Sequence, residues 1–140
     1  MRTFLLLLLL LSGIASANDA AMSCLEQFHH ALASGDQKQA LQLLRDDALI
    51  FESGYAENKS DYAAHHLAAD IDYANATKTQ AGVATVNCDT QLCLVTRQSE
   101  TSGHFNSKPV HSITMETAVL KLQDGAWRIQ HIHWSSRKAH

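Results

Sequence analysis

The sequence lacks the features by which several large classes of protein are recognised. It has one proline and six glycines in 140 residues, and it contains no repeats and no low-complexity linkers. No cluster of Lys and Arg could neutralise phosphates, and 14 acidic residues outnumber 11 basic ones, so no nucleic-acid partner is expected. The glycine-rich phosphate loop, the Gly-x-Ser-x-Gly turn and the His-Glu-x-x-His helix are all absent. Phosphoryl transfer, serine hydrolysis and zincin-type proteolysis therefore have no support.

A long apolar run occurs only at the N-terminus. Arg2 precedes seven leucines, Leu5 to Leu11, and the small-residue stretch Ala15-Ser16-Ala17 follows. This run is too short to span a bilayer as an anchor, and no basic flank follows it. We expect residues 1–17 to be a secretory signal peptide that is cleaved after Ala17. One domain, residues 18–140, would then be periplasmic or secreted, with no membrane association.

The expected mature chain is small, acidic and rich in histidine. Loss of Arg2 takes the eleven basic residues to ten, against fourteen acidic residues, and leaves a net charge of about −4. The remaining 123 residues suffice for one hydrophobic core and not for two domains. All nine histidines lie in this part, and histidine both ligates metals and titrates near neutral pH.

Three cysteines cannot all pair within one chain in an oxidising compartment. Cys88 and Cys93 are separated by four residues, a spacing that lets them face each other across a tight hairpin. We predict a structural disulfide between them, because a zinc site would need a second cysteine pair and tighter spacing. Cys24 is left over, as a buried helix residue, a free thiol or an intermolecular link.

The first half of the mature chain has helical periodicity. Ser23-x-x-Glu26 is typical of a capping box, and the apolar residues that follow predict a helix that ends at Gly35. Asp36 is expected to cap a short second helix, and Ser60 a third helix that fades near Tyr73. Leu49-Ile50-Phe51 predicts a strand between the last two helices, followed by a turn at Ser53-Gly54.

The second half is rich in threonine and valine and predicts strands. Four runs are expected to form a long antiparallel meander: Thr77 to Asn87, Leu92 to Thr101, Val110 to Leu122 and Ala126 to Ser135. Turns are expected at Asp89 to Leu92, from Ser102-Gly103 through Pro109, and at Asp124-Gly125. Helices followed by strands favour an α+β fold in which the N-terminal helices pack on one face of a curved antiparallel β-sheet.

Several short motifs are spread along nearly the whole mature chain: Gly35-Asp36, Leu43 to Ala48, Ser53-Gly54, His65-His66-Leu67, Glu116-Thr117 and Asp124 to Ile129. With these motifs the chain resembles the NTF2-like superfamily, particularly its SnoaL-like and DUF4440 branches. The resemblance implies a cone-shaped fold, a pocket between the helices and the concave face of the sheet, and a homodimer formed through the other face. It leaves function open, because this scaffold hosts isomerases, cyclases, dehydratases, binding modules and oligomerisation domains.

Two histidines alternate in the last expected strand. Because strand side chains alternate, we expect His131 and His133 to share a face with Trp127 and Ile129, while Trp134 points to the other side. Two imidazoles at i and i+2 can converge on one ligand. Alternation does not decide which face lines the pocket, and the family resemblance suggests the histidine face. The alternative is a pair of hydrogen-bonded residues on a solvent or dimer face.

A helix histidine opposite this pair would complete a nitrogen-rich metal site. His65 and His66 are adjacent on a helix and cannot both point into one site, and His66 lies nearer the apolar stripe. His66 with His131 and His133, and His65 beside them, are therefore the candidate ligands for copper or zinc. Four other histidines are not grouped with further candidate ligands, and no role is assigned to them: His29, His30, His104 and His111.

Carboxylates could complete the same site. In the resembling family, the segment that holds Glu52, Tyr55 and Glu57 lies at the mouth of the pocket, where either acid could be a ligand, a partner that fixes a histidine tautomer, or a general base. Glu116 sits in mid-strand, where an unpaired buried charge is costly. It is expected to form a salt bridge with Arg97, Arg128 or Arg137, or else to line the pocket.

Three functions follow from these residues. The first is an exported pocket protein that binds copper, zinc or a small ligand through the histidines, with affinity that is lost below about pH 6. The second is a cyclase- or isomerase-type enzyme that uses one histidine and one carboxylate as an acid-base pair in an apolar pocket. The third is a non-catalytic dimerisation module. No residue of the sequence is assigned as catalytic at this stage.

Overall fold

The computed structural model describes residues 16–140, which form four helices and seven strands. The helices are α1 (Ala17–Ser34), α2 (Gln37–Leu43), α3 (Lys59–His65) and α4 (Leu67–Ala76). The strands are β1 (Leu44–Glu52), β2 (Tyr55–Asn58), β3 (Thr77–Ala81), β4 (Thr85–Cys88), β5 (Leu92–Phe105), β6 (Lys108–Gln123) and β7 (Ala126–Lys138). Most of the predicted signal peptide, residues 1–15, lies outside the described residues.

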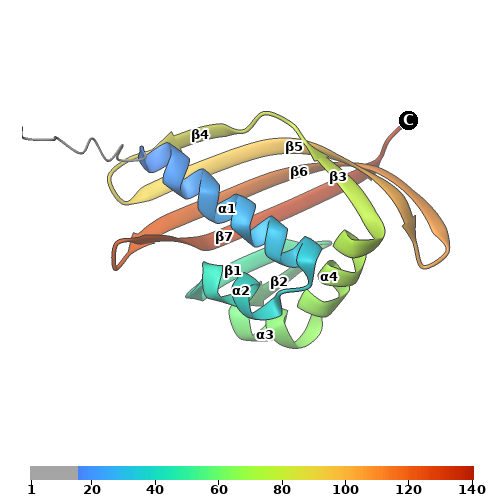
Figure 1. The fold of residues 1–140 in the computed structure, drawn as a ribbon, viewed down its shortest axis with the longest axis horizontal. Helices are drawn as coiled ribbons and strands as arrows, with labels where there is room; N and C mark the ends of the chain where they lie inside the picture. The colour runs from blue at the N-terminus through green and yellow to red at the C-terminus, as the bar shows by residue number, and fades with distance from the viewer. Residues whose placement is uncertain (1–15) are drawn as a thin grey trace, which may run out of the picture.

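All seven strands belong to one sheet with the order β2-β1-β7-β6-β5-β3, and β4 also pairs with β5. The strands from β4 to β7 form the predicted antiparallel meander, whereas β1 joins β7 in parallel, so the sheet is mixed. Figure 1 shows α1 running across β5, β6 and β7, with α3 beside β1 and β2 and α4 leading into β3. The predicted α+β class with helices on a curved sheet is confirmed.

The first helix begins earlier than its sequence suggests. Ser16 is the N-cap: its hydroxyl accepts a hydrogen bond from the backbone N–H of Asp19 at 3.2 Å. Ser23, the predicted cap, lies inside α1, where its hydroxyl accepts a bond from the Gln27 side chain. The predicted end is correct, because Gly35 has a left-handed φ of 75° and donates its N–H back to the helix.

The third predicted helix is two helices. Asn58 caps α3 by accepting the N–H of Asp61 at 2.9 Å, so the cap lies two residues before the expected Ser60. The helix is interrupted at His66 and continues as α4 to Ala76. The interruption changes the direction in which the side chains after His66 project, which periodicity in a single helix cannot anticipate.

The turns and strand ends are partly as predicted. Ser53-Gly54 and Asp124-Gly125 have positive φ at both positions, as two-residue hairpins require. The polar segment after Gly54, for which no strand was predicted, is strand β2 paired with β1. β5 runs on to Phe105, so the turn to β6 is at Asn106-Ser107, a shorter segment inside the predicted range from Ser102-Gly103 through Pro109.

The core lies between α1 and the inner face of the sheet. Six residues of α1 are buried against it: Ala21, Cys24, Leu25, Phe28, Ala31 and Leu32. Their sheet partners include Ile50 of β1, Val95 of β5, Leu120 of β6 and Ile132 of β7. Each fully buried aliphatic side chain of this kind stabilises the fold by roughly 1.5 to 3 kcal/mol.

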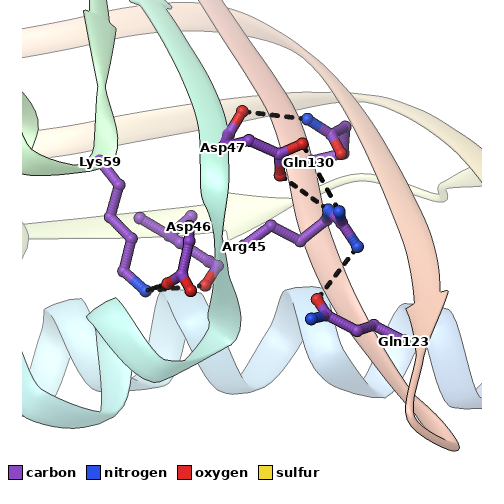
Figure 2. Close-up of polar contacts among 7 residues, drawn as sticks. Arg45, Asp46, Asp47, Lys59, Gln123 and Gln130 are labelled. Carbon is purple, nitrogen blue, oxygen red and sulfur yellow. Dashed lines mark hydrogen bonds and ion pairs between the residues drawn. The ribbon is translucent and has the colours of Figure 1, made fainter.

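A β-bulge at Gln130 reverses the alternation of β7. Ile129 pairs with Leu120, while His131 pairs with the preceding residue of β6, so Gln130 is an extra residue. Its side-chain amide donates to the carbonyl oxygen of Asp47 at 3.1 Å, and Arg45 bonds the carboxylate of Asp47 beside it (Figure 2). The opposing part of β1 is irregular too, since its register with β7 shifts at this point.

The predicted disulfide joins Cys88 and Cys93 across the β4–β5 hairpin. Cys24 is a buried free thiol that donates to the carbonyl oxygen of Trp127 at 3.2 Å. Burial raises the pKa of the Cys24 thiol to about 11, even though Arg128 lowers it. The thiol is therefore protonated and inaccessible, which rules out an intermolecular link through Cys24 in the folded state. None of the helices within residues 16–140 has the length and apolar character to cross a membrane.

Candidate functional site

A row of four side chains crosses the inner face of the sheet. Glu52 at the end of β1 lies opposite Trp134 of β7, which in turn lies opposite Glu116 of β6. Glu116 lies opposite Arg97 of β5. All four positions have the parity of the buried core residues of their strands, such as Ile50, so polar groups extend the apolar core in this row.

Arg97 and Glu116 form a buried ion pair that also ties α1 to the sheet. Nε of Arg97 donates to Oε1 of Glu116 at 2.8 Å, and Nη1 donates to Glu26 of α1 at 2.5 Å. The indole Nε1–H of Trp134 donates to Oε2 of Glu116 at 2.7 Å. The expected salt bridge of Glu116 is thereby confirmed, with Arg97 as its partner.

His29 of α1 completes this buried network. Its Nε2 lies 2.7 Å from Oε2 of Glu116, a distance typical of an ion pair, although the contact lacks the alignment of a hydrogen bond. Burial alone would raise the pKa of Glu116, but the His29 contact, the charge of Arg97 and the Trp134 bond outweigh it and lower that pKa to about 2. Glu116 is therefore a permanent carboxylate that holds the network together, and it is not free to exchange protons near neutral pH.

A second polar cluster lies at the Glu52 end of the row, where β1, β2, α3 and α4 meet. His66 Nδ1 lies 2.6 Å from Oε2 of Glu57, and the hydroxyl of Tyr62 donates to Oδ2 of Asp70 at 2.7 Å. The His66 bond raises the pKa of that imidazole, because the cationic form is stabilised by Glu57. We refer to Glu52, Glu57, Tyr62, His66 and Asp70 as the acidic cluster.

Among the carboxyl groups of the acidic cluster, Glu52 has a pKa close to neutral pH. Burial, the largest cause, and the negative charges of Asp70 and Glu57 raise its pKa, the charge of His66 opposes them, and the net value is about 7. Burial also raises the pKa of Asp70, although the hydrogen bond from Tyr62 partly offsets this. A carboxyl group with a pKa near 7 can both accept and return a proton at physiological pH.

The predicted convergence of strand and helix histidines is wrong. Because of the bulge, Trp127 and Ile129 face inward together with Ile132 and Trp134, and His131 and His133 face outward. His66 is on the inner side, in the acidic cluster, and His65 is exposed on α3. Within residues 16–140 no group of three or more His, Cys, Asp or Glu side chains is arranged to hold a metal ion.

The other predicted site residues divide between the two clusters. Glu52 and Glu57 belong to the acidic cluster, and Glu57 fixes the orientation of His66, one of the roles that the sequence suggested. Glu116 belongs to the buried network. Tyr55 is 63% exposed at the start of β2, with its ring 5.5 Å from that of His66, so it lies over the outer edge of the acidic cluster.

Four contributors to these clusters were missed in the sequence: Tyr62 and Asp70, His29, and Trp134. Tyr62 and Asp70 are eight residues apart and meet only because the helix is interrupted between them. His29 was detectable in principle, since it follows Leu25 by four residues and so lies beside the apolar stripe of α1. Trp134 was placed on the face opposite its true neighbours by the unseen bulge.

Two hollows occur on the described surface, and neither is lined by the acidic cluster. One, of about 230 Å³, lies on the outer face of the sheet and includes Met115 and Arg137. The other, of about 460 Å³, lies between the start of α1 and the β4–β5 hairpin and includes Asn18 and Leu94.

Comparison with known families identifies the chain. A model of the SnoaL-like domain matches residues 21–137, and the protein belongs to this family. A crystal structure of a candidate ketosteroid isomerase from Shewanella frigidimarina is 34% identical, with a TM-score of 0.79, over 83% of this chain and 94% of that one. A search of curated proteins gave no significant match.

More distant structures share the fold. The CaMKII hub of S. rosetta has a TM-score of 0.76 at 18% identity, over 89% of this chain and 99% of that one. A candidate calcium/calmodulin-dependent kinase II association domain from Exiguobacterium sibiricum has a TM-score of 0.72 at 14% identity, over 91% of this chain and 98% of that one. The same fold thus carries both an enzyme name and oligomeric hub names, so the site must decide the function.

Proposed function

We propose that the protein is an acid-base enzyme that moves a proton within a small carbonyl compound, with Glu52 as the catalytic base. The observation that carries this proposal is the raised pKa of Glu52, about 7, in a half-buried carboxyl group beside two further acids and a histidine. Such a pKa matches the operating pH of a general base, and groups of this kind are concentrated at active sites. The name of the 34% identical structure agrees with this reaction class.

In this reaction Glu52 and His66 have different roles. The Glu52 carboxylate takes a proton from the carbon next to the ketone, and the electron pair moves onto the ketone oxygen. The Nε2–H of His66 donates a hydrogen bond to that oxygen, while Nδ1 is held by Glu57. Glu52 then returns the same proton to a different carbon, and the double bond shifts accordingly. Reactant and product have the same composition, so no further reagent is needed.

The protonation states of Glu52 and His66 set the pH dependence of the reaction. Glu52 must be ionised, which favours pH above about 7, and His66 must be protonated to donate best. Glu57 supports the second condition, because its hydrogen bond raises the pKa of His66. The rate should therefore rise as Glu52 ionises near pH 7, and the raised pKa of His66 extends the pH range over which this donor stays protonated.

The direct test is turnover of a 3-ketosteroid that carries a β,γ double bond, followed through the ultraviolet absorbance of the conjugated product. We expect turnover in the native protein and a loss of at least about 100-fold in kcat for Glu52→Gln, the usual effect of removing a general base. Asp72→Asn is the matched control, since Asp72 is an exposed carboxylate on α4. Equal rates for Glu52→Gln and native protein would contradict the assignment of Glu52.

A second proposal concerns assembly: the chain forms a homodimer. The support is the set of large apolar side chains exposed on the outer face of the sheet, among them Leu49, Leu94 and Met115. Monomeric proteins seldom leave a contiguous apolar patch uncovered. Relatives of the same fold are named as hub and association domains, which agrees with an assembling scaffold. Sedimentation equilibrium should give twice the chain mass of 15.4 kDa, or slightly less after cleavage.

We further propose that the protein is exported. The support is the leader-like sequence of residues 1–17 together with the Cys88–Cys93 disulfide, a bond that persists in oxidising compartments. Mass spectrometry of the secreted or periplasmic protein should find Asn18 as the first residue. An intact Met1 terminus would contradict this proposal.

A further inference from the structure

The outer face of the sheet has a centre without permanent charge. We define this outer patch by three rows of outward-facing residues: Leu49, His131, Val119 and Leu94; Phe51, His133, Thr117 and Thr96; and Ser135, Met115 and Gln98. The first two rows cross four strands from β1 to β5. Its only titratable members are the two histidines at its middle, His131 and His133.

Several large apolar side chains of the outer patch are exposed to solvent, unlike the buried side chains of the core. Met115 is 53% exposed, Leu49 45% and Leu94 41%. Beside Met115 lies the hollow of about 230 Å³, which is large enough to receive an apolar side chain from a partner. Protruding apolar groups next to an apolar hollow on the same face are what an isologous contact between two copies requires.

The charges around the outer patch also favour a second copy. Lys121 lies beyond one end of it, and Glu100 lies beyond the other. If a two-fold axis runs across the strands, it reverses one copy relative to the other and brings Lys121 near Glu100 of its mate. The other ionisable side chains on the outer side of these strands lie beyond the two ends: Arg45, Asp47 and Arg128 at the first, and His104, His111 and Arg137 at the second. Nε2 of His111 lies 2.6 Å from Oε1 of Glu100 within one copy.

The size of the outer patch indicates a weak and adjustable dimer. Strands about 4.8 Å apart and a rise of about 3.4 Å per residue give an area of roughly 20 by 20 Å, or on the order of 400 Å² per copy. Stable complexes usually bury about 800 Å² per partner. A contact of about half that size has a small free energy of association, so charged groups at its centre can dissociate the dimer.

His131 and His133 lie at the centre of the outer patch, where a gain of positive charge would oppose the contact. Both rings pack against Phe51, with centroids 4.7 and 6.1 Å from its ring. Nδ1 of His131 contacts the carbonyl oxygen of Leu49 at 2.9 Å, so this nitrogen carries the proton and Nε2 is the atom that gains one in acid. The residues that flank the two rings on β1 and β6 are Leu49, Phe51, Val119 and Thr117, none of which can neutralise an imidazolium.

We propose that the outer patch binds a second copy of this chain and that protonation of His131 and His133 separates the two copies at acidic pH. This inference rests on the proposed homodimer and adds its control by pH. Two copies bring four imidazoles into one contact. Protonation would place up to four positive charges in this contact with no carboxylate beside them, and their repulsion opposes association. The dissociation constant should therefore rise at least tenfold between pH 7.5 and pH 5.5.

Sedimentation equilibrium at both pH values, on four proteins, tests the proposal. Native protein should be dimeric at pH 7.5 and shift to monomer at pH 5.5. Met115→Lys, which adds a charge in the outer patch, should be monomeric at both. Val83→Lys is the matched control, because Val83 is 98% exposed in the loop between β3 and β4 and should not alter assembly. The double variant His131→Gln/His133→Gln should stay dimeric at both pH values.

Each contrary result removes a defined part of the proposal. A native monomer at pH 7.5 and high concentration overturns the homodimer itself. A Met115→Lys dimer as stable as the native one shows that the contact lies elsewhere. A double glutamine variant that still dissociates in acid overturns the role of the two histidines, whatever the fate of Met115→Lys. Circular dichroism at both pH values confirms that each variant is folded.

Discussion

Nε of Arg97 donates to Oε1 of Glu116 at 2.8 Å, between residues that face each other on neighbouring strands and are almost fully buried. The two charges are compensated within the core, where an unpaired ion would cost several kcal/mol. Glu26 and His29 extend the pair to α1, so the helix is attached to the sheet by polar contacts as well as by apolar packing.

Removal of the Glu116 charge should destabilise the fold. Glu116→Gln leaves Arg97 without its carboxylate partner in the core, and a loss of about 3 to 5 kcal/mol in the free energy of unfolding is expected. Urea unfolding at pH 7 measures it. Asp72→Asn, which changes an exposed carboxylate on α4, should alter stability by less than about 0.5 kcal/mol.

The same carboxylate predicts acid sensitivity. The pKa of Glu116 is lowered in the folded state to about 2, from an ordinary value of 4.5, so its contribution is complete above about pH 4.5 and is lost as pH falls toward 2. The native protein should lose on the order of 3 kcal/mol over this interval. Glu116→Gln should show a much flatter dependence in the same urea titrations.

Glu52 predicts the opposite behaviour. Its pKa is raised on folding to about 7, so its ionisation opposes folding increasingly as pH rises from about 4.5 through 7. Glu52→Gln should therefore be more stable than native protein at pH 8, by about 1 kcal/mol after allowance for partial exposure, and nearly equal at pH 4.5. Thermal unfolding at both values decides this, and a stability difference independent of pH would contradict the raised pKa.

The cysteines give a prediction about thiol chemistry. Native protein should present no reactive thiol to Ellman's reagent, and denatured protein should present one, because Cys24 is buried and the other two are paired. Reduction of the Cys88–Cys93 bond should cost about 2 kcal/mol, the amount expected for a loop of this length. A Cys24→Ser variant should lose the thiol of the denatured protein and leave the effect of reduction unchanged.

The first turn of α1 predicts a dependence on where the mature chain begins. Ser16 caps the helix through the N–H of Asp19, and cleavage after Ala17 removes it. Protein that starts at Ser16 should be about 1 kcal/mol more stable than protein that starts at Asn18. Thermal unfolding of the two forms measures this, with a Ser16→Ala version of the longer form as the control that should match the shorter one.

The elements that the sequence predicted well are those marked by local chemistry. Gly35 ends α1 because a left-handed residue is needed there, and Asp36 caps α2 by accepting the N–H of Gln39. The Asp124-Gly125 hairpin and the Cys88–Cys93 pair were equally readable, because each depends on residues a few positions apart. Local rules also misled once: Ser23 and Glu26 satisfy the capping pattern, yet they lie inside a longer helix.

The candidate site was less predictable, since its groups come from distant segments. Glu52, Glu57 and His66 were found by residue type, but their grouping with Asp70 and Tyr62 depends on how α3, α4 and β1 pack. His131 and His133 were expected on the same side as His66. One inserted residue at Gln130, held by a contact with the backbone of Asp47, put them on the other face.

The sequence by itself determined the α+β class, the order of most elements, the disulfide and the resemblance to the NTF2-like superfamily, because these depend on periodicity, turn chemistry and spacing along the chain. Only the tertiary structure decided which polar residues are buried and which face each histidine occupies. Burial and long-range pairing set the pKa of Glu52 and of Glu116 in opposite directions, although both are glutamates in strands. Their surroundings are assembled by contacts between residues far apart in sequence, and no local pattern encodes them.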